Sequence, residues 1–204
     1  MVKVQGQEPY GSTPLDDYSG LRLSHISSLK ELYEAEFLNI TVATSNFLLK
    51  QIPLNVLMER NYLYKVHKIM FSKVWDWAGK KRTSNKSVGV DKIYIDIELA
   101  KFIKDFDYWE LSKMDPVEVS ARIHQKLVYI HPFENGNGRW ARLVTNVYLK
   151  QKINKIIFWP EQELFINNVF RNEYIQALQR ADRSDYQDLK KIHFDLISDL
   201  SSKE

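Results

Sequence analysis

The residues with the clearest chemical potential form one short segment, His131 to Arg142, which reads HPFENGNGRWAR. Gly136 and Gly138 stand where a loop is expected to become a helix, so main-chain N–H groups there can face an anion. Arg139 and Arg142 are three residues apart and share one face of that helix. Because the helix dipole disfavours cations near a helix start, two arginines there indicate a negatively charged ligand. A phosphate chain suits both the amides and the guanidinium groups.

The histidine at the other end of the loop adds a possible proton acceptor. An imidazole with a reference pKa near 6.5 can accept a proton at neutral pH. A base beside a site for several phosphates predicts phosphoryl or nucleotidyl transfer. Each feature alone has an ordinary structural alternative: a histidine before proline commonly packs, a Gly-Asn-Gly turn commonly starts a helix, and arginines on a helix are commonly solvated. Their combination in one segment favours the catalytic interpretation.

The same segment resembles the Fic motif, H-x-F-x-[DE]-G-N-[GK]-R-x-x-R. The matching positions are His131, Phe133, Gly136, Asn137, Gly138, Arg139 and Arg142. Outside the motif, the sequence VWDWAGKKRT at 74–83 is similar to the segment that leads into the target-docking flap of that family. Over about residues 11–195 the chain resembles the mobile mystery protein B-like subgroup of the bacterial Fic (filamentation induced by cAMP) proteins.

The resemblance implies a fold, an activity and a set of roles. The fold is all-α, a Fic-type helical bundle with a short β-hairpin flap beside the active-site loop. The activity is transfer of AMP from ATP, with Mg²⁺, to a hydroxyl side chain of a target protein. His131 is then the general base, Phe133 anchors the loop, Asn137 with the neighbouring amides holds the transferred α-phosphate, and the two arginines bind the β- and γ-phosphates. The nucleotide-binding residues so implied are Gly136, Asn137, Gly138, Arg139 and Arg142.

A flap that docks the target is implied at about residues 83–94. Its residues Thr83, Val88, Gly89 and Val90 are expected to pair with target backbone as an added strand. The residues alone suit either a short hairpin or an irregular loop. The stretch 73–92 is basic, with six Lys or Arg against two Asp, which suits an anionic nucleotide nearby.

The sequence departs from the motif at Asn135, where the family has an acidic residue that binds Mg²⁺. An amide oxygen carries no charge, so metal binding is expected to be weak and to depend on the substrate phosphates. The adjacent Glu134 is expected to point elsewhere. This departure leaves open a catalytically weak nucleotide-binding module with a regulatory or interaction role. A transferase that uses another nucleotide donor is a second alternative, because the motif contacts phosphates and not the base. Gly138 stands where Doc-type kinases carry Lys, which favours nucleotidyl transfer.

Many Fic proteins carry an inhibitory [ST]-x-x-x-E-[GN] helix whose Glu pairs with the second arginine of the motif. The chain offers only a partial match, from Ser27 to Glu31. The candidate inhibitory residues are Glu31, Glu34 and Glu36, and the hypothesis is that one of them reaches Arg142. Among the remaining histidines, His124 is expected to pack or to support the loop, and His67 and His193 are expected to pack on helix faces or to lie at the surface.

Helical periodicity of apolar residues predicts seven helices, at about 28–40, 53–69, 96–109, 116–130, 138–148, 161–180 and 185–200. The polar, turn-rich residues 1–24 predict an N-terminal arm, and 25–204 a single helical domain. Asp96, Asp115 and Asp185 are the expected caps of three of these helices.

Composition excludes several classes of protein. The 204 residues contain no cysteine, which excludes a disulfide scaffold, a thiol nucleophile and cysteine-bound zinc or iron–sulfur sites. A net charge of +3 is too small to indicate nucleic acid binding. Without a long apolar run or a secretory signal, the expectation is a cytoplasmic protein without membrane partners. Its expected partners are a nucleotide, a protein substrate and a regulator or antitoxin protein, and the subgroup suggests a toxin-like role.

Overall fold

The computed structural model describes residues 18–164 and 168–199 of the chain. Most of the predicted N-terminal arm, residues 1–17, lies outside the described residues. The part from Tyr18 onward follows the segment after α3 (Arg60–Phe71): Leu21 forms an isolated antiparallel bridge with Trp75, and Arg22 N donates to Val74 O at 2.9 Å.

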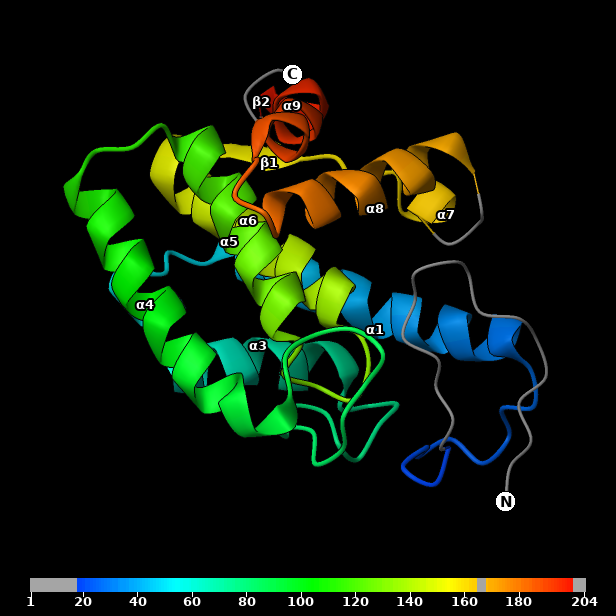
Figure 1. Cartoon of the computed structure of the whole chain (residues 1–204). Helices are drawn as coiled ribbons and strands as arrows, with labels where there is room; N and C mark the ends of the chain where they lie inside the picture. The colour runs from blue at the N-terminus through cyan, green and yellow to red at the C-terminus, as the bar shows by residue number, and fades with distance from the viewer. Residues whose placement is uncertain (1–17, 165–167, 200–204) are drawn as a thin grey trace.

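The described fold is all-α, as predicted. Helices α5 (Pro116–Ile130) and α6 (Asn137–Ile153) run side by side through the middle of the molecule (Figure 1). Helices α1 and α3 pack on one side of this pair, α4 flanks α5, and α8 and α9 cross its other end (Figure 1). The bounds of the other elements are α1 Leu29–Leu49, α2 Leu54–Leu57, η1 Lys92–Tyr94, α4 Ile95–Leu111, β1 Lys155–Ile157, α7 Glu161–Leu164, α8 Val169–Ala181, α9 Gln187–Leu196 and β2 Ile197–Asp199.

The central helices begin and end where local chemistry requires it. Asp115 caps α5 by accepting from Glu118 N at 2.9 Å, and Pro116 occupies the first turn, where no hydrogen bond is lost. The helix ends at His131, which adopts φ 51°, because the following proline disfavours the α region. Most positions along α6 are buried, which makes α6 the core helix of the bundle.

Several boundaries differ from the sequence prediction. The second predicted helix is two helices, α2 and α3, separated by Met58 and Glu59. Asp96 is not a cap: α4 begins one residue earlier, and Asp96 instead binds Arg60 at 2.7 Å and Lys81 at 2.6 Å. The predicted helix at 161–180 consists of α7 and α8, with 165–167 between them outside the described residues. The last predicted helix ends at Leu196, where β2 begins and pairs antiparallel with β1.

The predicted hairpin flap does not form as a hairpin. Residues 83–91 contain only bends and irregular backbone, and η1 follows them. Side chains hold this segment where strand pairing was expected: Asn85 Nδ2 donates to Asp91, whose other oxygen accepts from Ile93 N at 3.0 Å. Such side-chain bonds to backbone compete with a strand ladder, so the irregular loop is the form observed. Within the described residues, no helix is both long and apolar enough to cross a membrane.

Candidate functional site

The loop between α5 and α6 is anchored by a buried phenylalanine. Phe133 is fully buried, stacks on His67 with ring centroids 3.7 Å apart, and meets Trp140 edge-on at 4.9 Å. The ring of Phe133 in the loop is therefore packed between a ring from α3 and a ring from α6. Removal of the phenyl ring would leave a cavity, which typically costs about 3–5 kcal/mol.

The side chain of Asn137 closes the same loop. Its Oδ1 accepts from Phe133 N at 3.0 Å and its Nδ2 donates to Phe133 O at 2.9 Å. The residue is 1% exposed, so its amide braces the turn from inside. The resemblance implies that this residue and the neighbouring amides hold the α-phosphate, and the first N–H groups of α6, which lack acceptors within their helix, stand beside it.

His67, which the sequence analysis assigned to helix packing or to the surface, supports the loop from α3. His67 Nδ1 accepts from Gly79 N at 3.0 Å, so its Nε2–H donates to Asn135 O, also at 3.0 Å. Burial lowers the pKa of His67 to about 3, so the ring stays neutral and keeps this tautomer. His67 thus ties the loop to the turn that precedes the flap. No spacing in the sequence signals a contact across 68 positions.

The orientation of His131 suits a proton acceptor. Its Nδ1 lies 3.2 Å from Val128 O, so Nδ1 carries the proton and Nε2 is the basic nitrogen. Burial lowers the pKa of His131 to about 4, with smaller contributions from nearby Arg82 and Lys86. The imidazole is therefore neutral at pH 7.

The flap is docked directly onto this histidine by a buried arginine. Arg82 is 1% exposed; its Nε donates to His131 O at 2.7 Å, its Nη1 to Ser84 O at 2.7 Å, and its Nη2 to Val90 O. Gly89 has φ +95°, and a Cβ there would stand 2.3 Å from the Cβ of His131. The close approach explains why glycine is needed at this point of the flap.

The other predicted flap residues take different positions. Thr83 N faces Glu134 Oε1 at 3.3 Å, and Val90 N donates to Tyr129 O at 3.2 Å, so both ends of the flap are tied to α5 and its loop. Val88 is exposed. Glu134 also pairs with Lys86 at 2.6 Å, which confirms that its carboxylate points away from the anion site and toward the flap.

Arg139, the first arginine of the motif, is held by a buried carboxylate. Arg139 Nη1 lies 2.6 Å from Glu36 Oε2, and Glu36 Oε1 accepts from Trp75 Nε1 at 2.6 Å. The guanidinium also stacks over the Phe71 ring at 4.9 Å. Glu36 is 2% exposed, so its charge is compensated by fixed partners on both oxygens.

The second arginine pairs with a residue that the sequence did not single out. Arg142 Nε and Nη2 donate to the two carboxylate oxygens of Glu161, at 3.0 and 2.6 Å. The expectation that a glutamate of the first helix occupies Arg142 is not met. Glu31 instead forms a capping box with Ser28 at the start of α1, and Glu34 is exposed. Glu36 reaches Arg139 instead.

Comparison with known proteins agrees with the motif and the fold. The family model "Fic/DOC family" matches residues 57–149, which span α3 to α6 with the flap and the loop. This part of the chain, a little under half of its length, is therefore similar to the Fic/DOC family. Relatives named "Protein adenylyltransferase Fic" from Nematostella vectensis and "Protein adenylyltransferase fic-1" from Caenorhabditis briggsae are 39% identical over 92 residues and 34% identical over 112 residues. These matches cover 43% and 53% of this chain, and only 20% and 21% of the relatives, about a fifth of their length.

Solved structures of Fic domains and Fic-like proteins share the fold of this chain. The N-terminal Fic domain of a putative cell filamentation protein from Bartonella quintana has a TM-score of 0.71 at 19% identity, covering 96% of this chain and 95% of that one. The BepC protein from Bartonella tribocorum, with bound AMPPNP, has a TM-score of 0.69 at 19% identity, covering 92% and 96%. At such identities the likeness establishes the fold.

The loop between α5 and α6 does not present a good magnesium site. Asn135 Oδ1 already accepts from Gly136 N at 2.6 Å and from Arg139 Nη2 at 3.3 Å. Two donors, one of them cationic, thus face the only side-chain oxygen at the position where the motif has a carboxylate. Among the residues that the structure describes, no group of three or more His, Asp or Glu could hold a metal ion. The residues present therefore do not fit Mg²⁺, and no step below depends on it.

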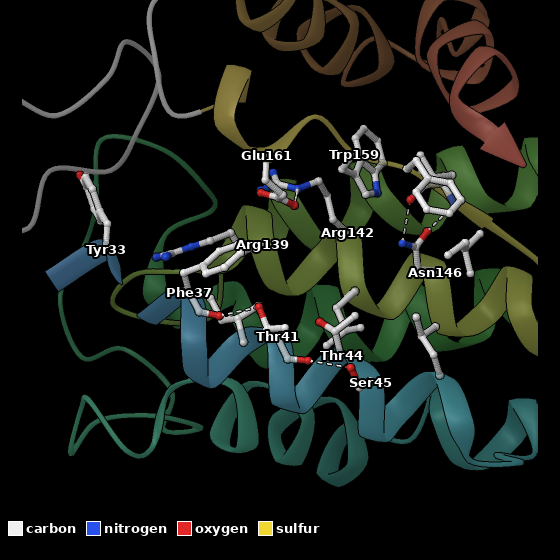
Figure 2. Close-up of a pocket in the computed structure, with 16 residues that line it drawn as sticks. Tyr33, Phe37, Thr41, Thr44, Ser45, Arg139, Arg142, Asn146, Trp159 and Glu161 are labelled. Atoms are coloured by element: carbon white, nitrogen blue, oxygen red, sulfur yellow. Dashed lines mark hydrogen bonds and ion pairs between the residues drawn. The ribbon is translucent and has the colours of Figure 1, made fainter. Parts of the chain in front are cut away.

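A cavity of about 310 Å³ lies beside the two arginines, between α1 and α6 (Figure 2). Hydroxyl groups of Thr41, Thr44 and Ser45 line its α1 side, and Figure 2 shows the Arg142–Glu161 pair at its α6 side. The site thus combines a neutral imidazole, the start of a helix and two guanidinium groups next to an open cavity.

Proposed function

We propose that this chain is a protein adenylyltransferase that transfers AMP from ATP to a hydroxyl side chain of another protein. One observation carries the proposal: a neutral histidine with Nε2 as its basic nitrogen lies at one end of the loop, and the start of α6 with two arginines lies at the other. The names of the relatives and the AMPPNP in one structural neighbour give further support.

The proposed reaction is a single displacement at phosphorus. His131 Nε2 takes the proton of the target hydroxyl, and the hydroxyl oxygen forms a bond to the α-phosphorus of ATP. The bond from that phosphorus to the bridging oxygen breaks, and pyrophosphate leaves with the electron pair. N–H groups around Gly136 and Gly138 face the α-phosphate, and Arg139 and Arg142 the β- and γ-phosphates. Positioning and charge stabilisation supply most of the rate.

The flap is proposed to align the target. Its ends are fixed to the loop and α5 at Thr83 and Val90, so an added target strand would pair between these ends, along Val88 and Gly89. This places the target backbone next to His131, against which Gly89 packs. The hydroxyl to be modified would then reach the imidazole.

The test uses purified protein with ATP labelled at the α- or the γ-phosphate, with and without a bacterial lysate. We expect protein-bound label from the α-phosphate only. The His131→Ala variant should give no label but should still bind ATP, because the imidazole is not among the groups proposed to bind the phosphates. Label from the γ-phosphate would identify a kinase. Label at the wild-type level with His131→Ala would show that this histidine is not the base. Parallel reactions with MgCl₂ and with EDTA measure the dependence on metal.

A second candidate function is a nucleotide-binding module without transfer. It is favoured by the neutral amide of Asn135, where the motif has a carboxylate, and by the pairing of Arg139 and Arg142 with carboxylates. This candidate expects ATP binding that responds little to Mg²⁺ and no label on any protein. If label appears only with Asn135→Asp, the natural residue has silenced a working site.

We also propose, from the sequence resemblance, membership of the mobile mystery protein B-like subgroup, a bacterial setting, a toxin-like role and a regulator or antitoxin partner. From the sequence pattern we propose a cytoplasmic setting and a division into a polar, turn-rich arm at 1–24 and a helical domain at 25–204.

A further inference from the structure

A continuous chain of hydrogen bonds runs through the described core and ends at the Tyr174 hydroxyl, beside Arg142. Ser120 Oγ lies 2.8 Å from His193 Nδ1, His193 Nε2 lies 3.0 Å from His124 Nδ1, and His124 Nε2 lies 2.9 Å from the Tyr174 hydroxyl. The Arg142 guanidinium interacts electrostatically with the same hydroxyl. The five residues come from α5, α9, α8 and α6, so the chain joins four helices.

The direction of every bond in this chain follows from its far end. Ser120 Oγ donates to Val117 O at 2.7 Å, so its oxygen must accept from His193 Nδ1–H. His193 Nε2 is then an acceptor, and His124 must donate to it through Nδ1–H. His124 Nε2 consequently accepts from Tyr174, whose oxygen lone pairs are left to face the arginine.

The near end favours the same direction independently. A guanidinium is positively charged and has only donors, so it attracts the lone pairs of the Tyr174 oxygen, and the hydroxyl proton then points to His124. Both ends therefore agree, and both histidines must be neutral with the proton on Nδ1. Burial lowers the pKa of His124 well below its usual value and that of His193 to about 3, which is consistent with this arrangement. The two imidazoles are fully buried.

Resting on the function proposed above, we infer that this chain of hydrogen bonds has a positioning role. It fixes the Tyr174 oxygen, which holds the Arg142 guanidinium in place for the terminal phosphates of the nucleotide. Arg142 has a second partner, Glu161, whose side chain is 37% exposed and which must be displaced when a phosphate takes its place. Tyr174 is neutral and 3% exposed, so it can remain bound through that exchange. Tyr174 is a positioning residue and does not itself contact the nucleotide.

The experiment compares affinities for ATP and AMP by isothermal titration calorimetry. AMP lacks the phosphates assigned to Arg142, so a positioning role affects ATP alone. Tyr174→Phe should raise the Kd for ATP about tenfold, the size expected when a hydrogen bond to a charged group is lost, and leave the Kd for AMP unchanged. The matched control is Tyr148→Phe, which removes another buried tyrosine hydroxyl, bound to Glu110 at 2.9 Å and remote from Arg142. It should change neither affinity.

The histidines give an independent pair of variants. His124→Leu removes the acceptor for the Tyr174 proton and should weaken ATP binding, whereas His124→Gln retains an acceptor and should restore most of it. Equal losses for ATP and AMP with Tyr174→Phe, or the same ATP loss with Tyr148→Phe, would overturn the inference, because a merely structural role predicts those results.

NMR separates failure of the inference from failure of the proposed function. The wild-type protein should show both histidines protonated at Nδ1, and Tyr174→Phe should shift the Arg142 Nε–H resonance while Tyr148→Phe leaves it in place. If the wild type binds no nucleotide, the proposed function is refuted, and the inference then depends on this resonance alone. An unshifted resonance, or Nε2-protonated histidines in the wild type, refutes the chain itself.

Discussion

The pairing of Arg142 with Glu161 makes a sharp prediction, because the carboxylate occupies the guanidinium face on which the proposed γ-phosphate would bind. The Arg142 side chain is 8% exposed and that of Glu161 37%. A hydrogen bond between charged groups contributes about 1.5–3 kcal/mol, and an exposed ion pair about 0.2–1 kcal/mol. This bidentate pair joins a buried side chain to a partly exposed one, so its contribution falls between the two, at about 1–2 kcal/mol.

That free energy sets the size of the effect. If Glu161 and the phosphate exclude each other, ATP binds only to the fraction of the protein in which Arg142 is not paired with Glu161. That fraction is about one fifth to one thirtieth, and the apparent Kd for ATP rises by its inverse. Glu161→Gln removes the charge at nearly constant volume, so the Kd for ATP should fall about tenfold. The Kd for AMP should not change. Since Arg142 loses its counter-charge, the free energy of unfolding should fall by about 1–2 kcal/mol at the same time.

The assay is calorimetric titration of ATP and AMP, with urea unfolding of the same samples. Glu163→Gln is the control, because this exposed residue lies on the same short helix α7. Tighter ATP binding together with lower stability is the diagnostic result. Unchanged or weaker ATP binding by Glu161→Gln would refute the competition, even if stability falls.

Three further predictions concern residues that pack around the loop. Because burial lowers the pKa of His131 to about 4 and of His67 to about 3, the unfolded chain takes up protons below pH 6.5 that the folded chain does not. The free energy of unfolding should therefore fall from pH 6.5 toward pH 5 by up to about 1.4 kcal/mol per unit for each such histidine, measured by urea titration; constant stability would contradict these pKa values. Gly89→Ala, whose Cβ would clash with His131, should reduce label transfer strongly with little change in the Kd for ATP; wild-type transfer would argue against flap docking. Glu36→Gln leaves Arg139 without its buried partner and should cost about 3 kcal/mol of stability by urea unfolding; a loss below about 1 kcal/mol would show that the pair is not structurally important.

Local signals in the sequence predicted the central part of the fold well. Asp115 followed by Pro116 marks the start of α5, and the glycine-rich turn marks the start of α6, because both signals act within one helical turn. The backbone conformation of the flap was harder to predict. Val88 and Val90 suit a strand, whereas hydrogen bonds from the side chains of Asn85 and its neighbours determine the irregular conformation that the flap adopts.

The parts of the site that the sequence missed come from distant segments. Glu161, Arg82 and His67 are separated from their partners in the loop and α6 by 19, 49 and 68 positions. Spacing within one helix carries no information about such contacts. One local signal was available and misassigned: Ser28 followed three residues later by Glu31 is a capping box, which explains that glutamate without an inhibitory role.

The attachment of the flap through side chains has a consequence for how target choice can evolve. Arg82 and Gly89 fix the flap against His131, and neither depends on which residues stand between them at the exposed positions Ser87 and Val88. In a strand ladder, an insertion there would shift the register of every later residue. Here the exposed tip can change its sequence while the anchors keep His131 in place, so under the proposed function a new target could be acquired without rebuilding the chemistry.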